Sequence, residues 1–239
     1  MYFWYKLFTY LFYPFAPVYL YFRKIRKKED ESRYKEKLSK IKIKRDDGFL
    51  VWFHMASVGE AMSILPLIEG CVEEKKIDKI LLTSITLSSG RVLEKRFKHN
   101  DKVVHQFLPL DLVFFTKKFL DHWKPNLSVF VDSEIWPNLI LQIDKKKIPL
   151  LLVNARITEK TFKKWKLVKS FAKLIFEKFT LCIASNKETE RYLETLGAKN
   201  IKNYGNIKFS QAKKNLNNEL DVSLLSKINS RKLWCAAST

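Results

Sequence analysis

The chain has 239 residues, of which 46% are hydrophobic and 29% charged, and its formal net charge is +20 at pH 7. This length can bury a sizeable core, and this composition excludes a disordered chain. The positive charge suits a protein that works against phosphates, anionic membrane surfaces or nucleic acid. Cys71, Cys182 and Cys235 lie far apart in apolar runs without metal-binding spacing, so we expect reduced thiols and no metal site.

The N-terminal segment is unusually aromatic. Residues 2–22 carry a single charge, Lys6, and are about as long as a bilayer-crossing helix, and the basic run RKIRKK follows at 23–28. We therefore predict a membrane anchor over residues 1–28, with a spanning helix favoured. Pro14 and Pro17 leave open a helix that lies in the membrane interface, and a helix in a soluble core is the third alternative. Residues 29–47 are predicted to be a charged, helix-prone connector.

From residue 48 onward, short apolar runs alternate with amphipathic stretches. The pattern predicts strands at residues 49–55, 79–84, 102–109, 127–133, 149–156, 180–186 and 201–206, with helices between them. One of these is a long basic helix over 158–178, and a last helix near 220–228 precedes a further strand from 231. Continuously apolar strands that alternate with helices indicate an α/β fold, a Rossmann-like parallel sheet with helices on both faces. Such sheets bind ligands at the carboxyl ends of their strands.

Polar residues gather at those strand ends. They are Ser57, Gly59 and Glu60 after the first strand, Asp132 and Glu134 after the fourth, Asn154 and Arg156 after the fifth, and Lys208 after the seventh. Carboxylates beside cations at one rim indicate acid–base chemistry on an anionic substrate. Each residue also has a structural explanation. Ser57 and Glu60 have the spacing of a helix capping box, and Lys208 in so lysine-rich a chain can be a surface residue.

The order of six motifs adds a resemblance to a known family. VWFHMASVGE, FLPLDL, SEIWPNLI, IPLLLVNARIT, GNIKFS and WCAAST resemble the bacterial 3-deoxy-D-manno-octulosonic acid (Kdo) transferases of glycosyltransferase family 30. The resemblance implies the N-terminal half of a two-domain GT-B enzyme attached to the bacterial inner membrane, with its catalytic part in the cytoplasm. It implies inverting transfer of Kdo from CMP-Kdo to the lipid A precursor, without metal, cofactor or nucleic acid.

The resemblance also implies roles for individual residues. Glu60 is the expected general base, and Glu134 and Lys208 are the further catalytic positions. The expected substrate-binding residues are Ser57, Gly59, Asn154, Arg156, Ser238 and Thr239. The sequence departs from the family pattern at Leu87, Ser88 and Ser89, at Asp132, where a glutamate is commoner, and in the connector, which lacks the usual E-R-x-G ending.

The resemblance predicts an acceptor domain over residues 48–230 and the start of a truncated donor domain over 231–239. A chain without the rest of that donor domain is expected to be inactive alone. Two alternatives stay open. One is a non-catalytic, membrane-attached module that binds anionic lipids through its lysines, and the other is a different acid-sugar transferase of the same architecture.

Overall fold

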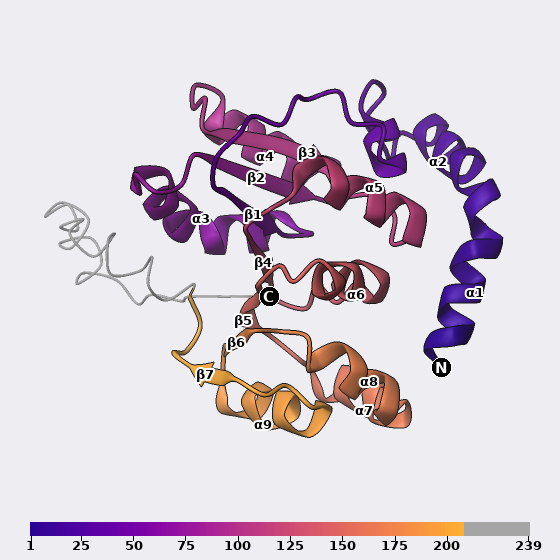
Figure 1. The fold of residues 1–239 in the computed structure, drawn as a ribbon, viewed down its shortest axis with the longest axis vertical. Helices are drawn as coiled ribbons and strands as arrows, with labels where there is room; N and C mark the ends of the chain where they lie inside the picture. Colours follow the sequence, from indigo (N-terminus) through magenta and orange to yellow (C-terminus); the bar gives the residue numbers. More distant parts are fainter. Residues whose placement is uncertain (208–239) are drawn as a thin grey trace, which may run out of the picture. The chain divides into compact units, whose positions relative to one another are not determined.

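The computed structural model describes residues 1–207, which contain a parallel sheet in the order β3-β2-β1-β4-β5-β6-β7 (Figure 1). The strands are β1 (Leu50–His54), β2 (Lys79–Ser84), β3 (Val103–Phe107), β4 (Leu127–Val131), β5 (Leu150–Ala155), β6 (Leu181–Ala184) and β7 (Ile201–Asn203). The strand predictions between residues 48 and 207 are confirmed, and so is the Rossmann-like α/β fold. The predictions for Lys208, the helix near 220–228, the strand from 231, Ser238 and Thr239 lie outside the described residues.

Helices cover both faces of the sheet, and its central strands β1, β2, β4 and β5 contribute apolar side chains to a core on each face (Figure 1). In β1, Trp52 faces one core with Phe119, while Val51 and Phe53 face a second core with Ile64. The first core is covered by α5 (Val113–Trp123), α6 (Pro137–Lys145), α8 (Lys169–Phe176) and α9 (Lys187–Leu196). The second is covered by α3 (Val58–Glu73) and α4 (Leu87–Phe97).

Two helix predictions need correction. The long helix expected over 158–178 is two helices, α7 (Glu159–Leu167) and α8, because Val168 has φ −119° and ψ 44°, outside the helical region. The connector over 29–47 contains one short 3₁₀ helix, η2 (Tyr34–Leu38), which ends at Ser39 in a left-handed conformation with φ 53°. The helix α9 (Lys187–Leu196) ends at Gly197, which adopts a left-handed φ of 103°.

The structure does not support the predicted membrane-spanning helix. Residues 2–25 form α1 (Tyr2–Phe12), a 3₁₀ turn η1 (Tyr13–Phe15) and α2 (Ala16–Ile25), with prolines at the start of η1 and of α2. Within residues 1–207, no helix combines the length and the apolar character that crossing a bilayer requires. One side of this segment lies instead against the domain, where Ala16 and Leu20 are buried with Phe115 (Figure 1).

Candidate functional site at the carboxyl ends of β1 and β4

The sheet reverses its direction of growth between β1 and β4. The chain runs outward from β1 through β2 to β3, then returns to place β4 on the opposite side of β1. In open α/β sheets the crevice at such a switch point is the usual ligand site. Glu60 lies in the first turn of α3, directly after the loop that follows β1, and Glu134 lies in the loop that follows β4. The fold therefore places both predicted catalytic carboxylates at this edge of the sheet.

Glu60 takes part in a capping interaction at the start of α3. The Ser57 hydroxyl donates to Glu60 Oε1 at 2.8 Å and accepts from the Glu60 backbone N–H at 3.3 Å. Glu60 Oε2 accepts from the backbone N–H of Ala56 at 2.7 Å, one residue before the N-cap Ser57. Each carboxylate oxygen has two lone pairs and spends one here, so each can still accept a bond from a ligand hydroxyl. The capping arrangement therefore fixes this carboxylate without using up its capacity as a base.

Gly59 leaves open space beside Glu60. A Cβ at this position would meet no atom within 4 Å, and Gly59 lacks the positive φ that favours glycine elsewhere. Neither packing nor backbone geometry in residues 1–207 therefore requires a glycine here. The open space lies over the first turn of α3, where backbone N–H groups and the helix dipole favour an anionic ligand.

Glu134 is mostly buried, with 11% of its side chain exposed, and has two hydrogen-bond partners on one oxygen. Its Oε2 lies 3.1 Å from His54 Nε2 and accepts from Trp136 Nε1 at 2.8 Å. Burial raises the pKa of Glu134, but the hydrogen bond and charge of His54 and the Trp136 N–H outweigh it, so the net shift is downward. This carboxylate is thereby held in its ionised form.

His54 is fully buried at the end of β1 and has hydrogen-bond partners on both sides of its ring. The Thr83 hydroxyl and carbonyl oxygens lie 3.0 and 3.3 Å from His54 Nδ1. The same hydroxyl accepts from Trp52 Nε1 at 2.8 Å. On the other side of the ring, Nε2 donates to the ionised Glu134 carboxylate at 3.1 Å. One buried imidazole therefore links β1, β2 and the loop after β4.

The residues after β5 lie at the same edge of the sheet but in different environments. Asn154 is buried, adopts a left-handed φ of 55°, and accepts through Oδ1 from the Ile207 backbone N–H at 3.2 Å. The Arg156 side chain is exposed, while its backbone N–H donates to the Asp132 carbonyl at 3.3 Å. Asn154 therefore fastens the loop after β7, and Arg156 presents a guanidinium at the rim.

Two motifs that carry the resemblance, FLPLDL and SEIWPNLI, are joined by hydrogen bonds that stabilise the fold. Asp111, from FLPLDL, accepts through Oδ1 from the Leu139 N–H at 2.8 Å and through Oδ2 from the Asn138 N–H at 3.0 Å, which caps α6. Its Oδ2 also accepts from the Tyr5 hydroxyl of α1 at 2.7 Å. Burial raises the pKa of Asp111 to about 6, against the lowering effect of these donors. One carboxylate therefore joins α1 to α6.

The sequence alone missed two of these partners. His54 is buried at the end of β1, and its pairing with Glu134 depends on β1 and β4 being neighbours. Tyr5 was treated as part of an anchor, and its bond to Asp111 spans 106 residues. Within residues 1–207, no group of three or more His, Cys, Asp or Glu side chains could hold a metal ion.

A family model described as 3-deoxy-D-manno-octulosonic-acid transferase matches residues 32–211. The chain belongs to the Kdo transferase family. A Kdo transferase of Rickettsia bellii is 37% identical over 237 residues, which cover 98% of this chain and 56% of the relative. A probable mitochondrial Kdo transferase of Arabidopsis thaliana is 37% identical over 179 residues, 74% of this chain and 40% of the relative. The chain thus spans about half the length of the curated Kdo transferases it matches.

Solved structures support the fold. A UDP-GlcNAc 2-epimerase from Neisseria meningitidis aligns with a TM-score of 0.51 at 11% identity, over 76% of this chain and 53% of that one. A putative UDP-N-acetylglucosamine 2-epimerase from Listeria monocytogenes aligns with a TM-score of 0.53 at 12% identity, over 77% and 52%. At these identities the likeness shows only that this member of the Kdo transferase family shares the fold of those proteins.

Proposed function

We propose that this chain forms the acceptor-binding half of an enzyme that transfers Kdo from CMP-Kdo to a hydroxyl of the lipid A precursor, with inversion at the anomeric carbon. The observation that carries the proposal is the Glu60 carboxylate, fixed by Ser57 and Ala56 beside the open space at Gly59. Glu60 follows β1 at the switch point of the sheet, where folds of this class bind ligands. GT-B architecture is part of the same proposal.

Glu60 has the role of general base. It takes the proton of the acceptor hydroxyl as that oxygen bonds to the anomeric carbon of Kdo. The bond from that carbon to the CMP phosphate breaks at the same time, and CMP departs with the electron pair. A positioned base of this kind contributes roughly 10²–10⁴ in rate.

The cations of the rim complement the anionic donor. Arg156 is exposed after β5 and can bind a carboxylate or phosphate through two N–H groups. Lys208 has a parallel role in the proposal but lies outside the described residues. Glu134 is ionised and paired with His54, so we assign it to positioning the rim and stabilising positive charge there, not to proton transfer.

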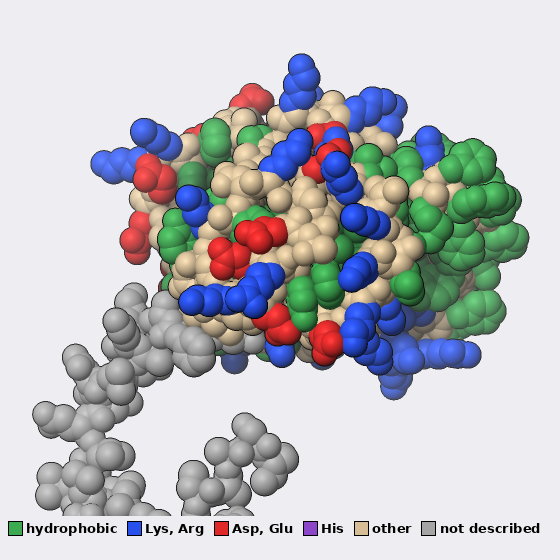
Figure 2. All heavy atoms as spheres, turned by 90° about the horizontal axis from the view of Figure 1, so that it is seen from below, with side chains coloured by type: hydrophobic (Ala, Val, Ile, Leu, Met, Phe, Trp, Pro, Cys, Tyr) green, Lys and Arg blue, Asp and Glu red, His purple; other side chains and the backbone are tan. Residues whose placement is uncertain are grey.

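Attachment to the bacterial inner membrane, with the catalytic part in the cytoplasm, is also part of the proposal. The outer side of α1, η1 and α2 exposes Phe3, Trp4, Phe8, Leu11, Phe15, Val18, Tyr21, Phe22 and Ile25. Figure 2 shows hydrophobic side chains gathered at the end of the molecule that these helices occupy. We name this set the aromatic face. An apolar face flanked by Arg23, Lys24, Arg26, Lys27 and Lys28 suits a helix lying in an anionic membrane interface.

The decisive test compares Glu60→Gln with the unchanged sequence, each as part of an enzyme that also contains a donor domain, in an assay of Kdo transfer from CMP-Kdo to the lipid A precursor. We expect the transfer rate to fall by roughly 10²–10⁴ while the unfolding free energy changes by less than about 1 kcal/mol, since glutamine keeps much of the cap. An unchanged transfer rate would refute the assignment of Glu60 as the general base. Vesicle binding without transfer by either protein would favour the non-catalytic lipid-binding module, and transfer of another acid sugar would favour the second alternative.

A further inference from the structure

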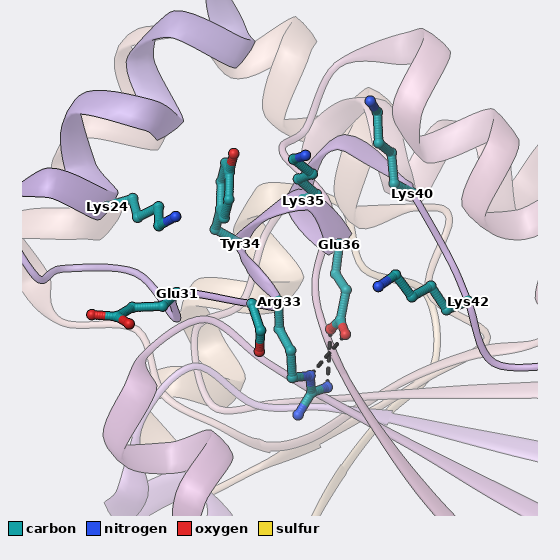
Figure 3. Close-up of a pocket in the computed structure, with 9 residues that line it drawn as sticks. Lys24, Glu31, Arg33, Tyr34, Lys35, Glu36, Lys40 and Lys42 are labelled. Atoms are coloured by element: carbon teal, nitrogen blue, oxygen red, sulfur yellow. Dashed lines mark hydrogen bonds and ion pairs between the residues drawn. The ribbon is translucent and has the colours of Figure 1, made fainter.

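A basic cavity of about 480 Å³ lies between α2 and η2, away from the rim that contains Glu60 (Figure 3). Its wall contains five cations and two acids, namely Lys24, Arg33, Lys35, Lys40 and Lys42 against Glu31 and Glu36. None of these residues belongs to the site described above. The charged connector between α2 and β1 therefore forms part of a concave surface.

The acids of this wall leave most of the positive charge uncompensated. Glu36 is already engaged, because it accepts from Arg33 at 2.8 and 2.9 Å and from the Phe107 backbone N–H at 2.9 Å. Arg33 in turn also contacts Glu94 and the His105 carbonyl. Within the described residues, the four lysines of the wall make no ion pair. Since Glu36 is engaged, Glu31 is the one remaining acid among the residues that line the cavity. Four ammonium groups against one carboxylate favour an anionic ligand.

Tyr34 brings two of these ammonium groups together in advance. Lys24 Nζ lies 5.2 Å and Lys35 Nζ 5.8 Å from the centroid of the Tyr34 ring, and Figure 3 shows the two lysines flanking that ring. Cation–π attraction at these distances holds flexible lysines near one another without neutralising them. An anion that enters the cavity meets cations whose positions are partly fixed, which lowers the entropy cost of binding.

The cavity adjoins the aromatic face. Lys24 belongs to α2, whose Tyr21, Phe22 and Ile25 are all more than half exposed. If those side chains enter a bilayer, the cavity lies at the level where the phosphates of lipid headgroups are found, next to the acyl boundary. This adjacency favours a lipid phosphate over a soluble one.

We propose that the cavity lined by Lys24, Lys35, Lys40 and Lys42 binds the phosphate headgroup of an anionic membrane lipid, which orients the chain on the bilayer. The inference rests on the membrane attachment in the proposed function. It adds a phosphate site distinct from the crevice in which sugar transfer is proposed.

The test measures binding of the chain to phosphatidylcholine vesicles with and without phosphatidic acid, at near-physiological salt. The triple variant K35Q/K40Q/K42Q removes three exposed cavity lysines, and K75Q/K76Q/K199Q removes the same charge from exposed positions elsewhere. Lysines near an anionic surface contribute about 1 kcal/mol each, so we expect the cavity variant to lose about tenfold or more in affinity for phosphatidic acid vesicles. The control variant should lose about twofold or less, and melting temperatures should match because all six side chains are exposed.

The outcomes separate the two proposals. Equal losses in both triple variants, with vesicle binding intact in the unchanged chain, would overturn the cavity site and leave membrane attachment standing. Absence of vesicle binding by the unchanged chain would overturn both. A second experiment measures binding of inorganic phosphate to the unchanged chain and to the cavity variant by calorimetry. If the cavity lysines change phosphate binding but not vesicle binding, the ligand is a soluble phosphate and the lipid assignment is wrong.

Discussion

His54 at the end of β1 donates a hydrogen bond to Glu134 after β4, with 3.1 Å between Nε2 and Oε2. Thr83 lies against the opposite side of the imidazole, and Trp136 donates a second hydrogen bond to the same carboxylate oxygen. The pair therefore joins the two strands on either side of the switch point. It holds the loop after β4 in one position relative to the end of β1, which leads into the helix that contains Glu60.

Replacing His54 by leucine should leave Glu134 buried with only the Trp136 donor. We expect the unfolding free energy to fall by about 2–4 kcal/mol at pH 7, because a buried charge has lost its partner. The pKa of Glu134 is depressed in the folded protein, so this stabilisation is complete above the unfolded value near 4.3 and is lost as the pH falls through the folded value. Urea unfolding at pH 7 and at about pH 3 should therefore show a large deficit at the first pH and a small one at the second.

Trp136→Phe is the matched control for this pair, since it removes one neutral donor and keeps an aromatic ring. Its deficit at pH 7 should be about 1 kcal/mol. If His54→Leu showed the same deficit at both pH values, the loss would come from packing against Phe130, whose ring centroid lies 5.3 Å from that of His54. The His54–Glu134 contact would then make no measurable contribution to the unfolding free energy.

Gly59→Ala separates the requirements of folding from those of substrate binding. The added methyl meets open space, and alanine is the better helix former, so we expect the protein to become more stable by up to about 1 kcal/mol. If the sugar approaches the backbone at this turn, Kdo transfer should fall, with most of the loss in KM. Thermal unfolding and transfer kinetics on the same preparation check both. Unchanged kinetics would show that the glycine serves neither fold nor substrate.

The fold was predictable from the sequence to the extent that it follows from local pattern. Apolar runs marked the central strands β1, β2, β4 and β5, and the Ser57 to Glu60 spacing marked both a helix start and a carboxylate after a strand. These signals lie within a few residues of one another. The chain therefore carried enough local information to indicate an α/β fold with Glu60 at its ligand-binding edge.

Pairings across the sheet were not predictable, because they depend on strand order. Nothing near His54 in the sequence indicates Glu134, since β4 becomes the neighbour of β1 only after β2 and β3 fill the other side. A related limit applies to the predicted spanning helix, which the structure does not support. Hydropathy counts the apolar residues of 2–22 but not their partners, and Tyr5 and Thr9 bind Asp111 and Asn138 of the domain.

Tyr5→Phe should loosen α1 in a pH-dependent way. The pKa of Asp111 in the folded protein is about 6, above its ordinary value of 3.8, so the folded state favours the protonated carboxyl. The stability that this preference contributes is complete below pH 3.8 and is lost as the pH rises through about 6. The Tyr5 hydroxyl limits that loss by donating to the ionised form. We expect Tyr5→Phe to lower the unfolding free energy by about 1.5–3 kcal/mol at pH 8 and by less at pH 4, measured by urea unfolding.

Tyr21→Phe is the control, because Tyr21 is 53% exposed. Loss of its hydroxyl should change the unfolding free energy by less than about 0.5 kcal/mol at either pH. A deficit for Tyr5→Phe that grew toward acid pH would contradict the assignment of Asp111 as the titrating group. It would point instead to a bond that strengthens when the carboxyl is neutral.

Substitution of Trp4 and Phe8 by serine tests whether the aromatic face enters a membrane. The two side chains are 66% and 67% exposed, so their loss should leave the unfolding free energy nearly unchanged. Each would bury its ring in the interface, where an aromatic side chain contributes about 1.5–3 kcal/mol, so the double variant should bind vesicles more weakly by at least about tenfold. The control pair is Phe49→Ser and Leu67→Ser, which removes exposed apolar side chains elsewhere. Equal binding by both double variants would show that attachment depends on charge alone, and high salt should then abolish it for the unchanged chain as well.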